Sequence, residues 1–146
     1  MQLAFYYAQN GTLWDKTIAA TTSGPFSHTE LLFPDNRWFS ASPRDGGVRF
    51  KTIDPKPGHW HFIPLDDAGL DWDAMLTFAS KLEGKHYDWI GILPPPGLHL
   101  PWRWFCSEVC AAALKKGGWH APWLWPAATS PNGLYRYLMK KRIAVK

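Results

Sequence analysis

Apolar and polar residues alternate along much of the first half of the chain, which predicts short β-strands. In "PFSHTELLF", residues 25–33, His28 and Glu30 share one face of an extended strand, and Thr29, Leu31 and Phe33 share the other. Two ionisable side chains in a largely apolar strand indicate either a half-buried strand with one solvent-exposed face or a partner residue opposite His28.

Four further segments have the composition of strands, and turn residues separate them. They are "QLAFYYA", "RWFSAS", "VRFKTI" and "HWHFIPL". Together with residues 25–33 they predict an antiparallel sheet of about four or five strands. The tripeptide "PDN" suits a three-residue hairpin loop with Asn36 in the left-handed region. That loop fixes a register in which Ser40 lies opposite Glu30.

Helix-start signals occur at four places along the chain. Thr12 and Asp15 form a capping-box pattern, and Asp71 precedes an amphipathic stretch. The other two helices are expected to begin at Cys106 and at Ser130–Pro131. A chain of this length with helices around a sheet predicts a single α+β domain over residues 1–146.

The composition, with 46% apolar and 19% charged residues, indicates a folded globule. The net charge of +4 is partly concentrated in "YRYLMKKRIAVK", which fits a solvated helix end or a segment attracted to phosphate or anionic lipid. No nucleic-acid module accompanies it, so nucleic acid is not an expected partner. Without a signal peptide or an apolar run of about 18 residues, we expect a cytoplasmic protein.

Three consecutive prolines interrupt "WIGILPPPGLHLPWRWF", residues 89–105, and exclude a continuous helix there. The segment fits a flap beside a cleft, a loop that gives peripheral membrane contact, or an irregular connection.

Cys106 and Cys110 are the chain's two cysteines, and their spacing within one helix disfavours a disulfide between them. Cys106 is expected at the helix N-terminus, where the dipole and unpaired N–H groups favour a thiolate and could stabilise an oxyanion. Cys110 falls in an apolar stripe and is expected to be inert. A buried cysteine is often only a core residue, so a nucleophile here also requires a base.

Among six histidines, His28 is the one best placed to serve as that base, because it lies inside a strand. His59 and His61 share a strand face but have no third ligand at a recognisable spacing. We therefore expect no metal and no cofactor. The remaining histidines, His86, His99 and His120, fall in predicted loops.

Three blocks, "SHTELLF…RWFSAS", "GKHYDWIGI" and "FCSEVC", resemble the signature blocks of circularly permuted, papain-like cysteine hydrolases of the NlpC type. In that family the histidine strand precedes the cysteine helix. "AFYYAQNGTLWDKTI" and "SPRDGGVRFKTI" are similar to short phage and prophage members. The resemblance covers residues 1 to about 133 and implies a papain-like domain with an antiparallel sheet flanked by helices.

Carried to this chain, the resemblance implies that Cys106 is the nucleophile and His28 the general base. The family's third residue aligns with Ser40, which cannot stabilise an imidazolium as a carboxylate does. Glu30 could supply that charge instead, or it could be a surface charge or a charge that stabilises the hairpin. Tyr87 and Asp88 fall in the family's "YD" block, and we expect them to pack near the cleft and to fix a turn.

The resemblance implies a cysteine peptidase, amidase, esterase or thioesterase that works through an acyl-enzyme. Its expected substrates are cell-wall peptides or acylated, lipid-derived molecules. An acyltransferase on the same scaffold remains an alternative, and so does a non-catalytic phage or cell-envelope interaction module. The location is then cytoplasmic or phage-associated.

Overall fold

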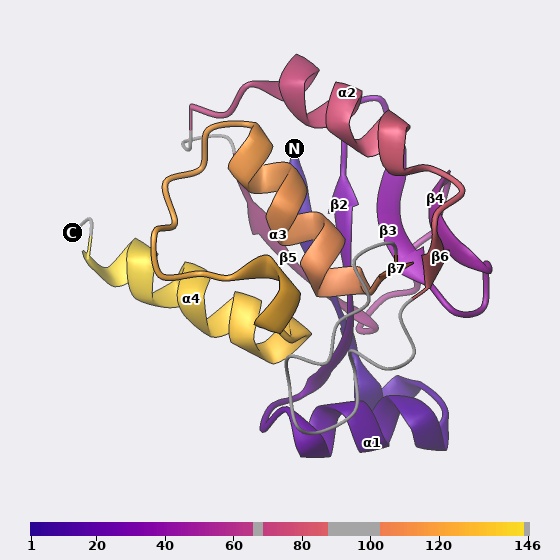
Figure 1. The fold of residues 1–146 in the computed structure, drawn as a ribbon. Helices are drawn as coiled ribbons and strands as arrows, with labels where there is room; N and C mark the ends of the chain where they lie inside the picture. Colours follow the sequence, from indigo (N-terminus) through magenta and orange to yellow (C-terminus); the bar gives the residue numbers. More distant parts are fainter. Residues whose placement is uncertain (66–68, 88–102, 145–146) are drawn as a thin grey trace.

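The computed structural model describes residues 1–65, 69–87 and 103–144, and these form an α+β fold around one twisted sheet (Figure 1). The strand order is β5-β1-β2-β3-β4-β6-β7. Neighbours from β5 to β6 are antiparallel, and β7 pairs with β6 in parallel. The strands are β1 (Gln2–Tyr7), β2 (Phe26–Leu32), β3 (Trp38–Ser42), β4 (Gly47–Lys51), β5 (Trp60–Pro64), β6 (His86–Tyr87) and β7 (Arg103–Trp104).

Four α-helices accompany the sheet in the described part of the chain. They are α1 (Leu13–Thr21), α2 (Trp72–Leu82), α3 (Cys106–Lys116) and α4 (Pro131–Ala144), with single 3-10 turns at Ala8–Asn10 and Pro126–Ala128. In Figure 1, α3 and α4 lie against one face of the sheet, and α1 and α2 lie at its two ends. None of the helices in the described ranges is both long and apolar enough to cross a bilayer.

The helix-start predictions are confirmed. Thr12 accepts a hydrogen bond from the backbone of Asp15, whose side chain bonds back to Thr12, and Asp71 accepts from Ala74 N. At the start of α4, Ser130 Oγ accepts a hydrogen bond from Gly133 N at 3.0 Å. Side-chain oxygens thus satisfy amide groups that would otherwise have no partner in the first turn.

The β2–β3 hairpin has the predicted loop and register. Asn36 has φ of 65°, and Phe33 N donates to Arg37 O at 2.9 Å. Leu31 then pairs with Phe39, and the same register places Ser40 beside Glu30.

The sheet is larger than the four or five strands expected, because β6 and β7 extend it beyond β4. Each of these strands has only two residues, too few for alternation to be visible in a sequence. The assignment of His86 to a loop was therefore wrong. β7 directly precedes α3, so it helps to fix where that helix begins.

The core lies between the sheet and helices α2, α3 and α4. Cys110 is fully buried, with Sγ at 3.7 Å from the carbonyl oxygens of Thr29 and Phe39. Cys110 is thus buried, as predicted, and the stripe of α3 that carries it packs directly on β2 and β3.

A β-bulge at the start of β2 gives His28 its direction. Tyr6 pairs with His28 while Tyr7 pairs with Phe26, so Ser27 is an extra residue in the strand. Strict alternation would put Phe26 and His28 on the same face. With the bulge, Phe26 is buried in the core and His28 instead lines a cavity.

Asn132 in α4 fixes the first residue of β2. Its side chain is buried, accepts from Phe26 N at 3.0 Å, and donates to Phe26 O at 2.8 Å and to Thr22 Oγ1 at 2.7 Å. The bulge beside His28 therefore starts from a backbone held on both its N–H and its C=O.

We predict that Asn132→Ala lowers the free energy of unfolding by about 2–4 kcal/mol, because it leaves buried backbone groups of Phe26 without partners. Urea denaturation measures the change. Asn10→Ala is the matched control, since Asn10 makes one exposed hydrogen bond to Gly58 O. Equal stability of the two variants would contradict this role of Asn132.

Candidate active site

Cys106 is the first residue of α3, as predicted from the sequence. Its N-cap, Phe105, is extended and has no side-chain acceptor for the amides of the first turn. Phe105 N instead donates to Glu108 Oε2 at 3.4 Å. Cys106 is 4% exposed, so its sulfur lies at a helix N-terminus in a largely dry environment.

The ring of His28 lies beside both Cys106 and Glu30. Its Nε2 is hydrogen-bonded to Glu30 Oε1 at 2.7 Å. The structure thus brings together three side chains that the sequence singled out, from β2 and from the start of α3. Their order, thiol then imidazole then carboxylate, is the arrangement in which an imidazole can exchange a proton with a thiol while a third group holds the ring.

Burial of His28 disfavours its charged form, but the negative charge and hydrogen bond of Cys106, together with those of Glu30, outweigh burial. They raise the pKa of His28 from 6.5 to about 10. The ring is therefore an imidazolium at neutral pH.

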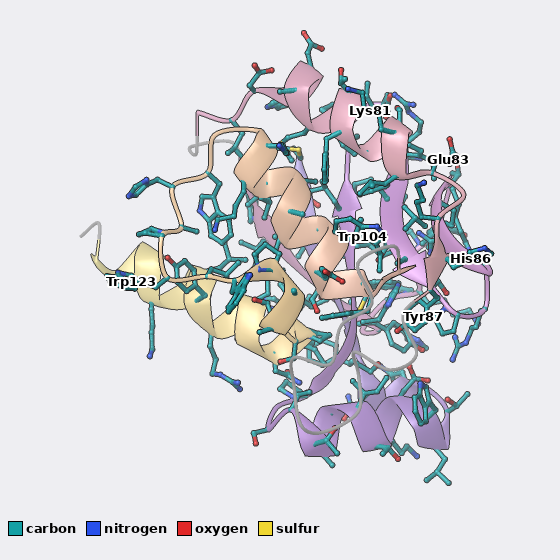
Figure 2. The ribbon with its side chains drawn as sticks, viewed as in Figure 1. Lys81, Glu83, His86, Tyr87, Trp104 and Trp123 are labelled. Carbon is teal, nitrogen blue, oxygen red and sulfur yellow. The ribbon has the colours of Figure 1, made fainter. Side chains whose placement is uncertain are left out.

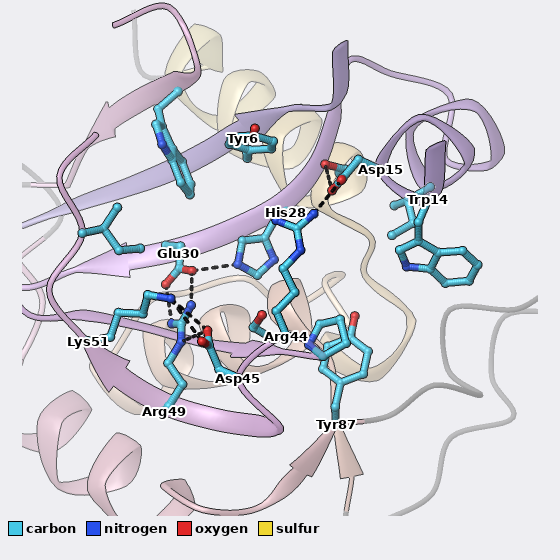
Figure 3. Close-up of a pocket in the computed structure, with 16 residues that line it drawn as sticks. Tyr6, Trp14, Asp15, His28, Glu30, Arg44, Asp45, Arg49, Lys51 and Tyr87 are labelled. Atoms are coloured by element: carbon cyan, nitrogen blue, oxygen red, sulfur yellow. Dashed lines mark hydrogen bonds and ion pairs between the residues drawn. The ribbon is translucent and has the colours of Figure 1, made fainter. Parts of the chain in front are cut away.

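Glu30 is 1% exposed, so it is not the surface charge that was the alternative for this residue. Arg49 contacts it in a two-point ion pair, with Nη1 at 2.7 Å from Oε2 and Nη2 at 2.6 Å from Oε1 (Figure 3). Burial raises the pKa of Glu30, but the hydrogen bonds from Arg49 and His28 lower it by more. The pKa of Glu30 therefore lies below its usual value. Glu30 is thus an ionised carboxylate in a fixed orientation.

Arg49 is the residue of this site that the sequence reasoning missed. It pairs with Ser40 across β3 and β4, so it lies in the same row of the sheet as Glu30. Its Nε donates to Asp45 Oδ2 at 2.7 Å, and Lys51 Nζ lies 3.1 Å from Asp45 Oδ1. Arg49 could have been found from the registers of β2 with β3 and of β3 with β4, because together they place a cation two strands from Glu30 on the same face of the sheet.

Ser40 does not hold the histidine. Its hydroxyl is fully buried and donates to Thr29 O at 2.6 Å. The alignment of Ser40 with the third residue therefore does not correspond to a contact with His28 in this structure, because the hydroxyl is used by the neighbouring strand. The carboxylate of Glu30, two residues after His28, makes the contact with the ring.

Cys110 stays apart from this chemistry. Burial, with the negative charges of Glu30 and Cys106 adding to it, raises the pKa of Cys110 well above its usual value. The second cysteine is therefore a neutral thiol in the core.

A cavity of about 250 Å³ reaches the histidine side of this group (Figure 3). His28, Glu30 and Arg49 form part of its wall, and an ion pair between Arg44 and Asp15, 3.0 Å apart, lies beside them. Four aromatic residues also line it, namely Tyr6, Trp14, Trp60 and Tyr87. Cys106 is not among the lining residues, so the cavity meets the imidazole rather than the sulfur.

The other predictions from the sequence concern Tyr87, Asp88, the proline-rich segment and the remaining histidines. Tyr87 is buried and lines the cavity, as expected. Asp88, His99 and most of residues 89–105 lie outside the described residues. His59 and His61 contact the rings of Tyr6 and Tyr7, and no cluster of three or more potential metal ligands occurs in the described ranges.

Comparisons of the chain with protein-family models, with curated proteins and with solved structures give no match.

Proposed function

We propose that the protein is a cysteine hydrolase in which Cys106 is the nucleophile, His28 the general base and acid, and Glu30 the residue that holds His28. The observation that carries the proposal is the position of the His28 ring, which lies beside Cys106 at the start of α3 and is hydrogen-bonded to the buried carboxylate of Glu30. Groups with such strongly shifted pKa values cluster at functional sites.

In the proposed reaction, the thiolate of Cys106 attacks a carbonyl carbon, and the carbonyl π electrons move to the oxygen. Backbone N–H groups at the start of α3 stabilise this oxyanion. The imidazolium of His28 then gives its proton to the departing nitrogen, oxygen or sulfur, leaving an acyl-enzyme on Cys106. In the second half, His28 takes a proton from water, the resulting hydroxide attacks the acyl group, and the thiolate is regenerated.

We further propose that the domain has the papain-like, circularly permuted NlpC-type fold. The support is the chain order, with the histidine on β2 and the cysteine on the later helix α3, which packs on β2 and β3. The substrate class is an amide, ester or thioester, in a peptide or an acylated molecule, and the location is cytoplasmic or phage-associated.

An acyltransferase would use the same acyl-enzyme and differs only in the acceptor. The alternative of a non-catalytic interaction module depended on Ser40 replacing a charged third residue. That basis is weakened because Glu30 supplies a carboxylate to the same ring.

The test is to mix the protein with a p-nitrophenyl ester, an acyl thioester and an acyl peptide amide, each with and without an added amine or alcohol. We expect a burst of leaving group equal to the enzyme concentration for at least one substrate, followed by turnover. Release of free acid without an acceptor indicates a hydrolase, and product formation only with an acceptor indicates a transferase. No burst with any of the three substrates would contradict the proposal.

A further inference from the structure

Two tryptophans project from the segment that joins α3 to α4. Residues 121–128, "APWLWPAA", are all apolar, and Trp123 and Trp125 are 91% and 76% exposed. Leu124 between them is 5% exposed. The segment therefore buries Ala121 and Leu124 in the core and holds its two largest apolar side chains in water, which is unfavourable unless a partner covers them.

The connection between α3 and α4 contacts both helices. Lys115 of α3 donates from Nζ to Leu124 O at 2.7 Å. The ring of Trp119 packs edge-on against Tyr137 of α4, with centroids 5.5 Å apart. In Figure 2, Trp123 accordingly lies on the same side of the molecule as α4. The two exposed indoles are thus presented from a fixed position beside α4.

The charge of the chain is divided very unevenly around this segment. Seven of the sixteen Lys and Arg residues follow Glu108, and none of the twelve Asp and Glu residues does. Residues 109–146 therefore carry a formal charge of +7, whereas residues 1–108 carry −3. Lys140 of α4 is among the exposed cations. The exposed tryptophans belong to the strongly basic part of an otherwise acidic chain.

We propose that residues 121–128 and α4 form a docking surface for an anionic lipid bilayer. Tryptophan is favoured at the membrane–water interface, where its apolar ring leaves water and its N–H remains hydrated. Cations beside it add attraction to anionic headgroups. A nucleic acid would also attract the charge, but the indole N–H groups are the only polar side-chain groups in residues 121–128, so the segment offers little for reading bases. The docking surface does not depend on the proposed catalytic function.

The test is flotation of the purified protein with phosphatidylcholine vesicles and with equimolar phosphatidylcholine–phosphatidylglycerol vesicles. We expect binding to the anionic vesicles only, reduced by salt. The double variant Trp123→Ser/Trp125→Ser should lose at least about tenfold in affinity, and Trp123→Phe/Trp125→Phe should recover part of it. Lys140→Gln should lose roughly fivefold, the effect of one cation at the surface.

Matched controls come from exposed residues of the acidic part of the chain. Trp72→Ser in α2, where the side chain is 40% exposed, and Lys56→Gln should bind as the unchanged protein does. Failure to bind anionic vesicles at low salt would overturn the proposal. So would equal binding by the double serine variant, or tryptophan-dependent binding to single-stranded DNA or to a second copy of the chain in place of vesicles.

Discussion

Replacing Cys106 with alanine is expected to abolish both turnover and rapid alkylation by iodoacetamide, by about 10⁴-fold or more in rate. Replacing Cys110 with alanine should leave both nearly unchanged. The physical reason is that the sulfur of Cys106 has an imidazolium beside it, whereas burial keeps Cys110 as a neutral thiol. Alkylation quenched after a series of set times, followed by peptide mass mapping, measures the rates at the two cysteines separately.

Thermal unfolding of both variants serves as the control, because Cys110 lies in the core and its substitution removes packed atoms. The account requires that Cys106→Ala lose activity while remaining as stable as Cys110→Ala, or more stable. Faster alkylation of Cys110 than of Cys106 in the folded protein would be incompatible with the proposed nucleophile.

The second large effect is expected from Glu30→Gln, which removes a charge and keeps the shape. His28 has its pKa raised to about 10, so the imidazolium is present below that pH and is lost as the pH rises through it. Without the carboxylate the pKa should fall by roughly 1–3, the usual influence of one adjacent opposite charge. The alkaline limb of the turnover profile, set by the imidazolium that protonates the leaving group, should then move to lower pH, with reduced turnover at neutral pH.

Ser40→Ala is the matched control for Glu30→Gln, since Ser40 lies in the same row of the sheet but bonds to Thr29 O. It should cost about 1 kcal/mol of stability and leave the pH profile in place. Glu30→Gln also leaves Arg49 with a weaker partner, so a urea titration must accompany it. A shifted profile for Ser40→Ala and an unchanged one for Glu30→Gln would make Ser40 the residue that holds His28.

Local features of the fold were predictable because their causes are local. The start of α3 at Cys106, the cap at Asp71 and the hairpin loop at Asn36 each depend on a few adjacent residues. Burial of Cys110 followed from its place in an apolar stripe of one helix. These features account for the position of the thiol and for the register beside Glu30.

Features that depend on contacts between distant segments were not predicted. β6 and β7 exist because each gains a neighbour in the sheet, and their two residues carry no pattern of their own. The role of Arg49 required two registers in succession, from Glu30 to Ser40 and from Ser40 to Arg49. The direction of the Ser40 hydroxyl depends on the nearest carbonyl, which a sequence does not give.

The acyl-enzyme itself tests the central claim most directly. The protein is mixed with the ester or thioester that gives a burst, quenched in acid at the end of the burst, and digested for peptide mass mapping. One acyl group per chain is expected, located on Cys106, and none in His28→Ala within the same time. An acyl group on Cys110 or on another residue, or turnover with no acyl group on Cys106, would contradict it.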